Sequence, residues 1–110
     1  MAKGDFIGEF ELYVLLALVH LEEDAYGLRI RQLIEARTNR HVAIGAVYAT
    51  LGRLADKGLA DHRLTEPQPV QGGRSRKVYR LSAAGERALT HSTSMLANML
   101  AGAKLPGGSK

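Results

Sequence analysis

The 110-residue sequence contains neither cysteine nor tryptophan. The absence of cysteine excludes disulfides, thiolate nucleophiles and cysteine-ligated zinc, and it agrees with a reducing cytoplasm. Long apolar runs are also missing. The longest, Leu12–Val19, is too short to span a membrane, and it follows acidic residues rather than a basic leader. We therefore expect a cytoplasmic protein with no signal peptide, no membrane anchor and no membrane partner.

Patterns typical of catalysis are lacking as well. The four histidines are scattered, and no pair of them has the spacing of metal ligands. No glycine-rich loop follows a strand and opens a helix, and no sequence indicates a strained nucleophile turn. The sequence therefore predicts no catalytic residues, no metal and no cofactor, and it does not indicate an enzyme.

The residues that are present indicate one small globular domain. A chain of this length forms a single domain, and a hydrophobic content of 45% is enough for a modest core. The net charge is +4 and the sequence pI is about 9.7. A basic balance of this kind favours a polyanionic partner such as nucleic acid.

The most informative stretch is Val42–Lys57, which we interpret as a recognition helix ended by Gly58. One helical stripe is apolar at a spacing of three or four: Ile44, Val47, Leu51 and Leu54. The other face carries small residues at Gly45, Ala49 and Gly52, beside Tyr48, Arg53 and Lys57. Each helical glycine costs about 1 kcal/mol relative to alanine. The bare face therefore favours a large partner close to the backbone, either a DNA major groove or a neighbouring helix of the same chain.

The preceding residues complete a helix-turn-helix pattern. We predict an amphipathic helix over Ala25–Arg37 with Asp24 as its N-cap, followed by a polar turn over Thr38–His41. Arg40 and His41 would lie near the N-terminus of the recognition helix, where a phosphate can bind. Two helices joined by a short polar turn are typical of DNA-binding proteins.

A basic hairpin is expected after the recognition helix. Leu59–Thr65 and Arg76–Leu81 alternate as strands, and Glu66–Gly73 contains the prolines and glycines of a loop. The cations Arg74, Arg76, Lys77 and Arg80 follow one another with no acid among them. Such a wing suits phosphate or minor-groove contact, although a solvated basic edge strand that discourages aggregation is the alternative.

The first and last helices indicate a second subunit. Glu9–Leu21 is apolar on nearly all sides, and the helix that begins at Ser82 and ends near Ala101 carries a broad apolar stripe. The alternative for the last helix is that it folds back on its own core. The expected dimer interface comprises Leu12, Leu15, Leu16, Val19, Leu89, Ser92, Met95, Leu96, Met99 and Leu100.

These elements define the predicted fold class: mainly α with a small β-hairpin, a winged helix-turn-helix with an additional C-terminal dimerisation helix. Residues 1–8 form a lead-in, 9–81 the DNA-binding domain, 82–101 the dimerisation helix and 102–110 a flexible tail.

Three stretches make the chain resemble the PadR family of bacterial transcriptional regulators. They are YGLRI (Tyr26–Ile30), IGAVYATLGRLADKGL (Ile44–Leu59) and GGRSRKVYRLSAAGERAL (Gly72–Leu89), and they follow a leucine-rich first helix. The resemblance covers roughly residues 10 to 90 and suggests the family's short form. It implies a homodimeric transcriptional repressor that binds double-stranded DNA. A small apolar effector or a stress signal would release the repressor from the DNA.

Carried over by position, the resemblance implies a set of DNA-binding residues. They are Gly45, Ala46, Tyr48, Ala49, Arg53, Arg74, Arg76 and Lys77. The full predicted set adds their neighbours Arg40, Ala43 and Ser75. The chain departs from the family where serine or threonine often caps the recognition helix. Ala43 stands there, so the helix start is weaker or Arg40 and His41 compensate. It departs again at Ala49, where the family often has proline, so the local groove contact differs.

Two other functions remain open. A winged helix can serve as a protein–protein interaction module that never binds DNA. Alternatively, the chain binds DNA and its dimer interface acts as a ligand sensor, with Met95, Leu96 and Met99 around an adaptable apolar pocket. The last helix, however, has no aromatic ring of the kind that drug-binding members of the family use.

Overall fold

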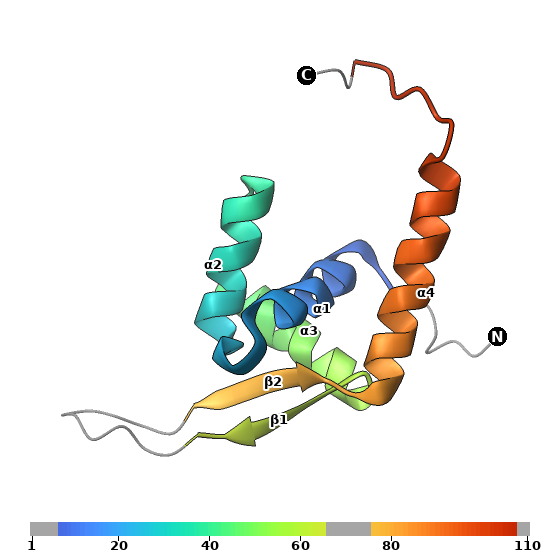
Figure 1. Cartoon of the computed structure of the whole chain (residues 1–110). Helices are drawn as coiled ribbons and strands as arrows, with labels where there is room; N and C mark the ends of the chain where they lie inside the picture. Colours follow the sequence, from blue (N-terminus) through green and yellow to red (C-terminus); the bar gives the residue numbers. More distant parts are fainter. Residues whose placement is uncertain (1–6, 66–75, 108–110) are drawn as a thin grey trace.

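Four α-helices and one antiparallel hairpin make up the part of the chain that the computed structural model describes, residues 7–65 and 76–107 (Figure 1). The elements in chain order are α1 (Glu9–Leu21), the short 3₁₀ helix η2 (Glu22–Asp24), α2 (Gly27–Thr38), α3 (Ile44–Asp56), β1 (Ala60–Leu64), β2 (Lys77–Leu81) and α4 (Ala83–Leu100). The predicted helices and strands are therefore all found, and the bounds of the first helix agree with the prediction.

Helix α1 lies at the centre, with α2, α3, the hairpin and the start of α4 around it (Figure 1). The residues with no exposed surface come from α1, from the start of α2 and the segment before it, and from α3: Val14, Leu15, Ala25, Ile30, Val47, Leu51 and Leu54. Burying each large aliphatic side chain contributes about 1.5–3 kcal/mol. The apolar stripe predicted for the recognition helix is thus its core side.

The hairpin is tied to the helices through β2. Residues His62 and Tyr79 are opposite one another in the antiparallel register. Neighbouring side chains on a strand point to opposite faces, yet Val78 and Tyr79 are both buried, so the helices cover β2 on both sides. The Tyr79 N–H also donates to the carbonyl oxygen of Ala25 at 2.8 Å. This bond fixes the base of the wing against the segment before α2.

The same bond corrects the predicted start of α2. The helix begins at Gly27 with Tyr26 as N-cap, not at Ala25 after an Asp24 cap. Because Tyr79 binds Ala25, the backbone there is held outside the helix. The Asp24 carboxylate instead accepts a hydrogen bond from Arg29 Nε at 3.0 Å.

Local signals at two other helix ends are confirmed. Gly58 follows α3 with a φ of +75°, a conformation that glycine adopts without steric cost. The Ser82 hydroxyl caps α4 by accepting from the Gly85 N–H at 2.9 Å, and it donates to the Gly58 carbonyl at 2.6 Å. Because Ser82 donates to Gly58, the end of α3 is joined to the start of α4.

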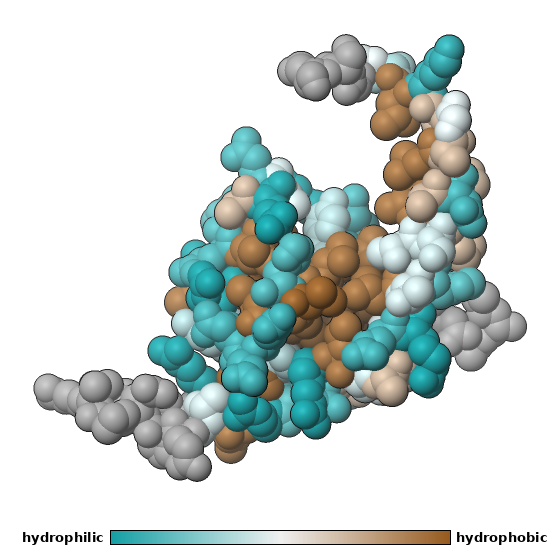
Figure 2. All heavy atoms as spheres, in the orientation of Figure 1, coloured by the Kyte–Doolittle hydropathy of each residue, from teal (hydrophilic) through white to brown (hydrophobic). Residues whose placement is uncertain are grey.

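Helix α4 leaves the body of the domain after its first turns. Gly85 and Leu89 are buried, whereas every residue from Ser94 to Leu100 is exposed. In Figure 2 apolar side chains on α4 and on the body lie on opposite sides of an open hollow. The alternative that this helix folds back on its own core is therefore wrong for its second half.

Two residues of the expected dimer interface belong to the core of the single chain. Leu15 is fully buried and Leu89 is 7% exposed. The pattern missed this because α1 has neighbours of its own on several sides. No helix in residues 7–65 and 76–107 is long and apolar enough to cross a membrane.

The junction at Gly85 generates a stability prediction. A Cβ atom on Gly85 would overlap the carbonyl oxygen of Leu59, which is backbone and cannot rotate away. Gly85→Ala should therefore destabilise the fold by about 1–3 kcal/mol or more. Gly52→Ala is the matched control, since nothing lies within 4 Å of its Cβ position and a helical alanine should stabilise by about 1 kcal/mol. Urea unfolding of both variants measures the difference, and an unaffected Gly85→Ala protein would contradict the close packing.

Candidate nucleic-acid interface

Helix α3 presents a continuous face of small residues to solvent. The exposed positions on and before it are Ala43, Gly45, Ala46, Tyr48, Ala49, Gly52, Arg53 and Asp56. The buried positions are Val47, Thr50, Leu51 and Leu54. All of the residues predicted for DNA contact on this helix lie on its exposed side.

No helix in the described part of this chain packs on the glycines of α3. No heavy atom lies within 4 Å of the Cβ position of Gly45 or Gly52 among the described residues. The alternative of a covering helix from the same chain is therefore wrong for this part of the molecule. Gly45 and Gly52 are seven residues apart, so they fall on one face of the helix, where a partner can approach the backbone closely.

Tyr48 connects this face to the start of α2. The side chain is 52% exposed, and its ring lies across Gly27, where a Cβ atom would come within 2.5 Å of Tyr48 Cζ. Burial raises the pKa of the nearby Tyr79 phenol, and Tyr48 adds to this effect. The inner side of the Tyr48 ring thus packs on Gly27, while its outer side remains exposed to solvent.

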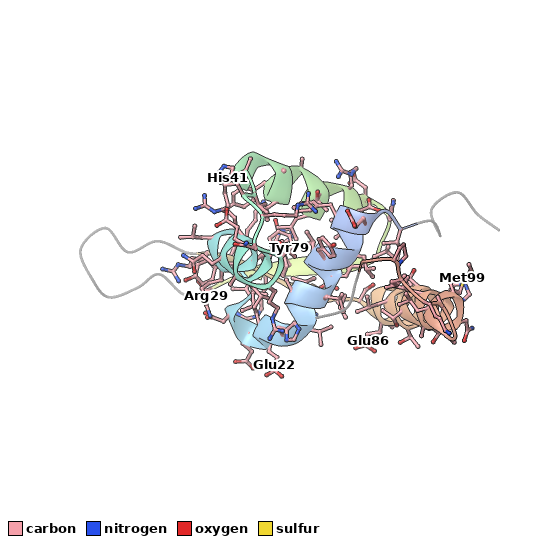
Figure 3. All side chains as sticks on the ribbon, turned by 90° about the horizontal axis from the view of Figure 1, so that it is seen from above. Glu22, Arg29, His41, Tyr79, Glu86 and Met99 are labelled. Atoms are coloured by element: carbon pink, nitrogen blue, oxygen red, sulfur yellow. The ribbon has the colours of Figure 1, made fainter. Side chains whose placement is uncertain are left out.

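The turn before α3 is closed by Glu35. Its carboxylate accepts from the Val42 N–H at 2.8 Å and lies 3.5 Å from His41 Nδ1. As expected, Ala43 provides no side-chain cap. Figure 3 shows His41 at the beginning of α3 with its side chain in solvent.

Arg40 does not compensate for the missing cap. Its Nη1 lies 3.7 Å from Glu9 Oε1, and its guanidinium is 6.0 Å from the centre of the Tyr13 ring. Both contacts are to α1. The residue is half exposed, and these two contacts join the turn to α1 rather than to the start of α3.

The wing cations have different surroundings. Arg76 stacks on Tyr26 with its guanidinium carbon 4.3 Å from the ring centre, and both Arg76 and Lys77 are exposed. Arg80 is paired with Asp61 across the hairpin at 2.7 Å, so the basic run is partly neutralised. Arg74, Ser75 and the predicted loop Glu66–Gly73 lie outside the described residues. Tyr26 and Gly27 thus bring the wing and the recognition helix to one corner of the domain.

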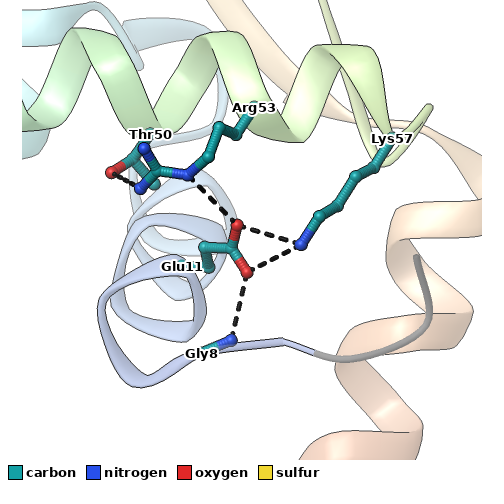
Figure 4. A network of polar contacts seen from close by, with 5 residues as sticks. All are labelled: Gly8, Glu11, Thr50, Arg53 and Lys57. Carbon is teal, nitrogen blue, oxygen red and sulfur yellow. Dashed lines mark hydrogen bonds and ion pairs between the residues drawn. The ribbon is translucent and has the colours of Figure 1, made fainter. Parts of the chain in front are cut away.

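A carboxylate from α1 holds the C-terminal half of α3 (Figure 4). Glu11 is 8% exposed. Its Oε1 accepts from the Gly8 N–H, and both oxygens accept from Lys57 Nζ, each at 3.0 Å. Arg53 Nε lies 3.6 Å from Oε2, and Arg53 Nη2 donates to the Thr50 hydroxyl at 3.0 Å. The network fixes one exposed cation and one half-buried cation of α3.

Sequence reasoning missed this role of Glu11. The available signal was its spacing, since Glu11, Leu15 and Leu18 follow at i, i+4 and i+7 on the buried stripe of α1. Burial acts to raise the pKa of Glu11. The Gly8 hydrogen bond and the cations Lys57 and Arg53 outweigh it, so the pKa falls below its usual value of 4.5.

The residues expected at the dimer interface that remain accessible lie mostly on α4. Met95, Leu96, Met99 and Leu100 are between 46% and 79% exposed, and Val19 on α1 is 49% exposed. Leu12, Leu16 and Ser92 are half-buried. In residues 7–65 and 76–107 no group of three or more histidines and carboxylates could hold a metal ion.

Comparison with known proteins agrees with this geometry. Residues 15–91 match the model of the PadR-like family of transcriptional regulators. A PadR-like transcription factor from Bacteroides fragilis is similar in structure, with a TM-score of 0.68 and 27% identity over 82% of each chain. The expected winged-helix fold is thereby confirmed. No match was found among curated proteins.

Two more distant structures show the same fold. RosR from H. salinarum has a TM-score of 0.68 and 22% identity, covering 89% of this chain and 81% of its own. A PadR family transcription regulator from hypervirulent Clostridium difficile R20291 has a TM-score of 0.61 and 23% identity, covering 80% and 88%.

The lowered pKa of Glu11 predicts an acid-dependent loss of stability. A carboxylate with a depressed pKa in the folded state stabilises the fold above about pH 4.5, and this contribution is lost as the pH falls through the folded-state pKa. Glu11→Gln should lower the free energy of unfolding by about 1–3 kcal/mol at neutral pH. The difference from the parent protein should shrink below about pH 4.5. Urea unfolding across this range tests it, and a pH-independent difference would rule out the charge as the cause.

Proposed function

The chain belongs to the PadR-like family of transcriptional regulators, and from this premise we propose that it is a homodimeric repressor that binds operator DNA with α3 and the wing. The single observation that carries this proposal is the bare, accessible face of α3 beside a cationic hairpin. The family match supports a DNA-binding regulator in general. Repression, action in the cytoplasm, and release by a small apolar effector are further parts of the proposal, and they follow from the family resemblance.

The chemistry of α3 supports a particular mode of DNA recognition. Ala46 and Ala49 offer methyl groups that can contact thymine methyls, and Gly45 permits close approach. None of these positions carries a side chain for a bidentate purine contact. We infer that sequence preference rests in large part on the shape and deformability of the DNA.

Charge placement supports phosphate binding around this face. Arg53 is 56% exposed while one side of its guanidinium is held by Glu11 and Thr50. At the wing, Arg76 and Lys77 are exposed close to the same corner. A guanidinium whose direction is fixed loses less entropy on binding a phosphate.

The exposed half of α4 supports a dimer of this chain. Its apolar residues, at positions 95, 96, 99 and 100, recur at helical spacing on one stripe, and the body offers an apolar surface across the hollow in Figure 2. A two-fold dimer would present two α3 helices to half-sites about 34 Å apart. The same surface would receive a small apolar effector.

The wing generates a salt-dependence prediction. Replacing Arg74, Arg76 and Lys77 by alanine should weaken binding to all duplexes and reduce the slope of log affinity against log salt by roughly three units, because three phosphate contacts are lost. Fluorescence anisotropy with a random duplex measures this. Arg87→Ala combined with Lys104→Ala is the control, since both cations lie outside the proposed surface. No binding of the parent protein at low salt would instead favour a protein–protein interaction module.

The dimer generates a second prediction. Leu96→Glu with Met99→Glu should convert a particle of twice the 11.9 kDa chain mass into one of 11.9 kDa, because two carboxylates would be buried without partners. Thr90→Glu with Ser94→Glu on the polar face is the matched control and should keep the parent mass. Light scattering after size exclusion gives the answer. A parent protein of 11.9 kDa at micromolar concentration would overturn the homodimer.

A further inference from the structure

Glu11 stands out because it is a buried carboxylate on a core helix that contacts two cations of the recognition helix. Its oxygens receive Lys57 Nζ and the Gly8 N–H at 3.0 Å, and Arg53 Nε lies 3.6 Å away. With 8% exposure, Glu11 is screened from solvent by the helices around it. The Gly8 hydrogen bond caps the start of α1, whereas the contacts to the two cations reach a different helix.

The two cations differ in their exposure and in their contacts with this carboxylate. The Lys57 side chain is 25% exposed, and its ammonium faces both oxygens of Glu11. The Arg53 side chain is 56% exposed and is fixed at two nitrogens, by Glu11 and by the Thr50 hydroxyl, while the rest of its guanidinium faces outward. Figure 4 shows both side chains reaching down from α3 to the one carboxylate. Arg53 is therefore oriented, and Lys57 is held back.

We propose that Glu11 is a specificity-determining positioning residue, which presents Arg53 in one direction and withholds Lys57 from DNA phosphates. This inference rests on the proposed DNA-binding function. Cations that reach phosphates strengthen binding to every sequence, whereas a shape-reading face gains affinity only where the groove fits. A phosphate contact that is equal for all sequences leaves the ratio of specific to non-specific binding unchanged. The gain in specificity therefore comes from the fixed direction of Arg53, which favours the duplex whose phosphates match it, while Lys57 is kept from adding affinity for every duplex.

The expected effect of removing the charge follows from counterion release. In Glu11→Gln, Lys57 loses its carboxylate and can reach a phosphate, which adds about 0.9 unit to the salt slope. At about 0.1 M salt, one added unit of slope corresponds to a roughly tenfold gain in non-specific affinity. Arg53 loses its fixed direction in the same variant, so operator affinity should not gain equally, and the specificity ratio should fall up to about tenfold.

The test uses the full chain and two DNA probes. A preferred duplex is first selected with the parent protein from a random library, and its scrambled counterpart serves as the non-specific probe. Dissociation constants for both are measured over about 50 to 300 mM salt, the range in which phosphate contacts dominate the slope. Asp56→Asn is the control, because it makes the same charge change at the exposed end of α3, and its two affinities should shift together.

The outcomes are distinct. A steeper slope on the scrambled duplex and a lower specificity ratio for Glu11→Gln support the inference. Equal losses on both duplexes with an unchanged slope mean that Glu11 is only structural, and they overturn it. A parent protein that binds no duplex overturns the proposed function, and the inference with it.

A second variant tests the inference independently of the folding of Glu11→Gln. If Lys57 is held back, Lys57→Gln should leave the non-specific salt slope nearly unchanged, whereas Arg76→Gln at the wing should reduce it by about one unit. Equal reductions in the two variants would show that Lys57 already contacts phosphate. That result would overturn the proposal.

Discussion

The packing of α3 against α1 is the constraint on which the rest of the structure depends. Val47, Leu51 and Leu54 are fully buried, and a helix with one side in the core must turn its opposite side outward. That opposite side is where Gly45, Ala49 and Gly52 stand. The accessible face of α3 is therefore a direct consequence of the core, and Glu11 fixes its rotation at the C-terminal end.

Features encoded by local sequence were predictable. Periodicity placed α1 and α3, and the turn residue Gly58 and the cap Ser82 act in the structure as their chemistry suggests. The exposed positions of α3 followed from the same periodicity, because a 3.6-residue repeat assigns every position to a face. For this reason the candidate DNA-contacting side of the helix was visible before any tertiary contact was known.

Features that depend on tertiary contacts were not predictable. The start of α2 moved because Tyr79 of β2 binds the Ala25 carbonyl. Leu15 lies in the core since α1 is covered by its own chain at that position, and Arg80 is neutralised by Asp61 only when the hairpin forms. In the sequence Glu11 is only an acid before an apolar run, because its partner Lys57 at the end of α3 lies 46 residues later and is brought to it by the fold.

The energetics of Glu11 bear on why a carboxylate occupies this place at all. Buried ion pairs are weak evidence for stability, because desolvation offsets much of the attraction and a well-packed apolar residue is often equally good. An apolar side chain at Glu11 would serve the core but would leave Lys57 and Arg53 without their shared counter-ion. Besides its hydrogen bond to the Gly8 N–H at the start of α1, the charge provides the arrangement of these two cations. Arg53 stands in the last turn of α3 and Lys57 is its C-cap. The buried carboxylate of Glu11 therefore determines where two cations of the outward-facing helix lie.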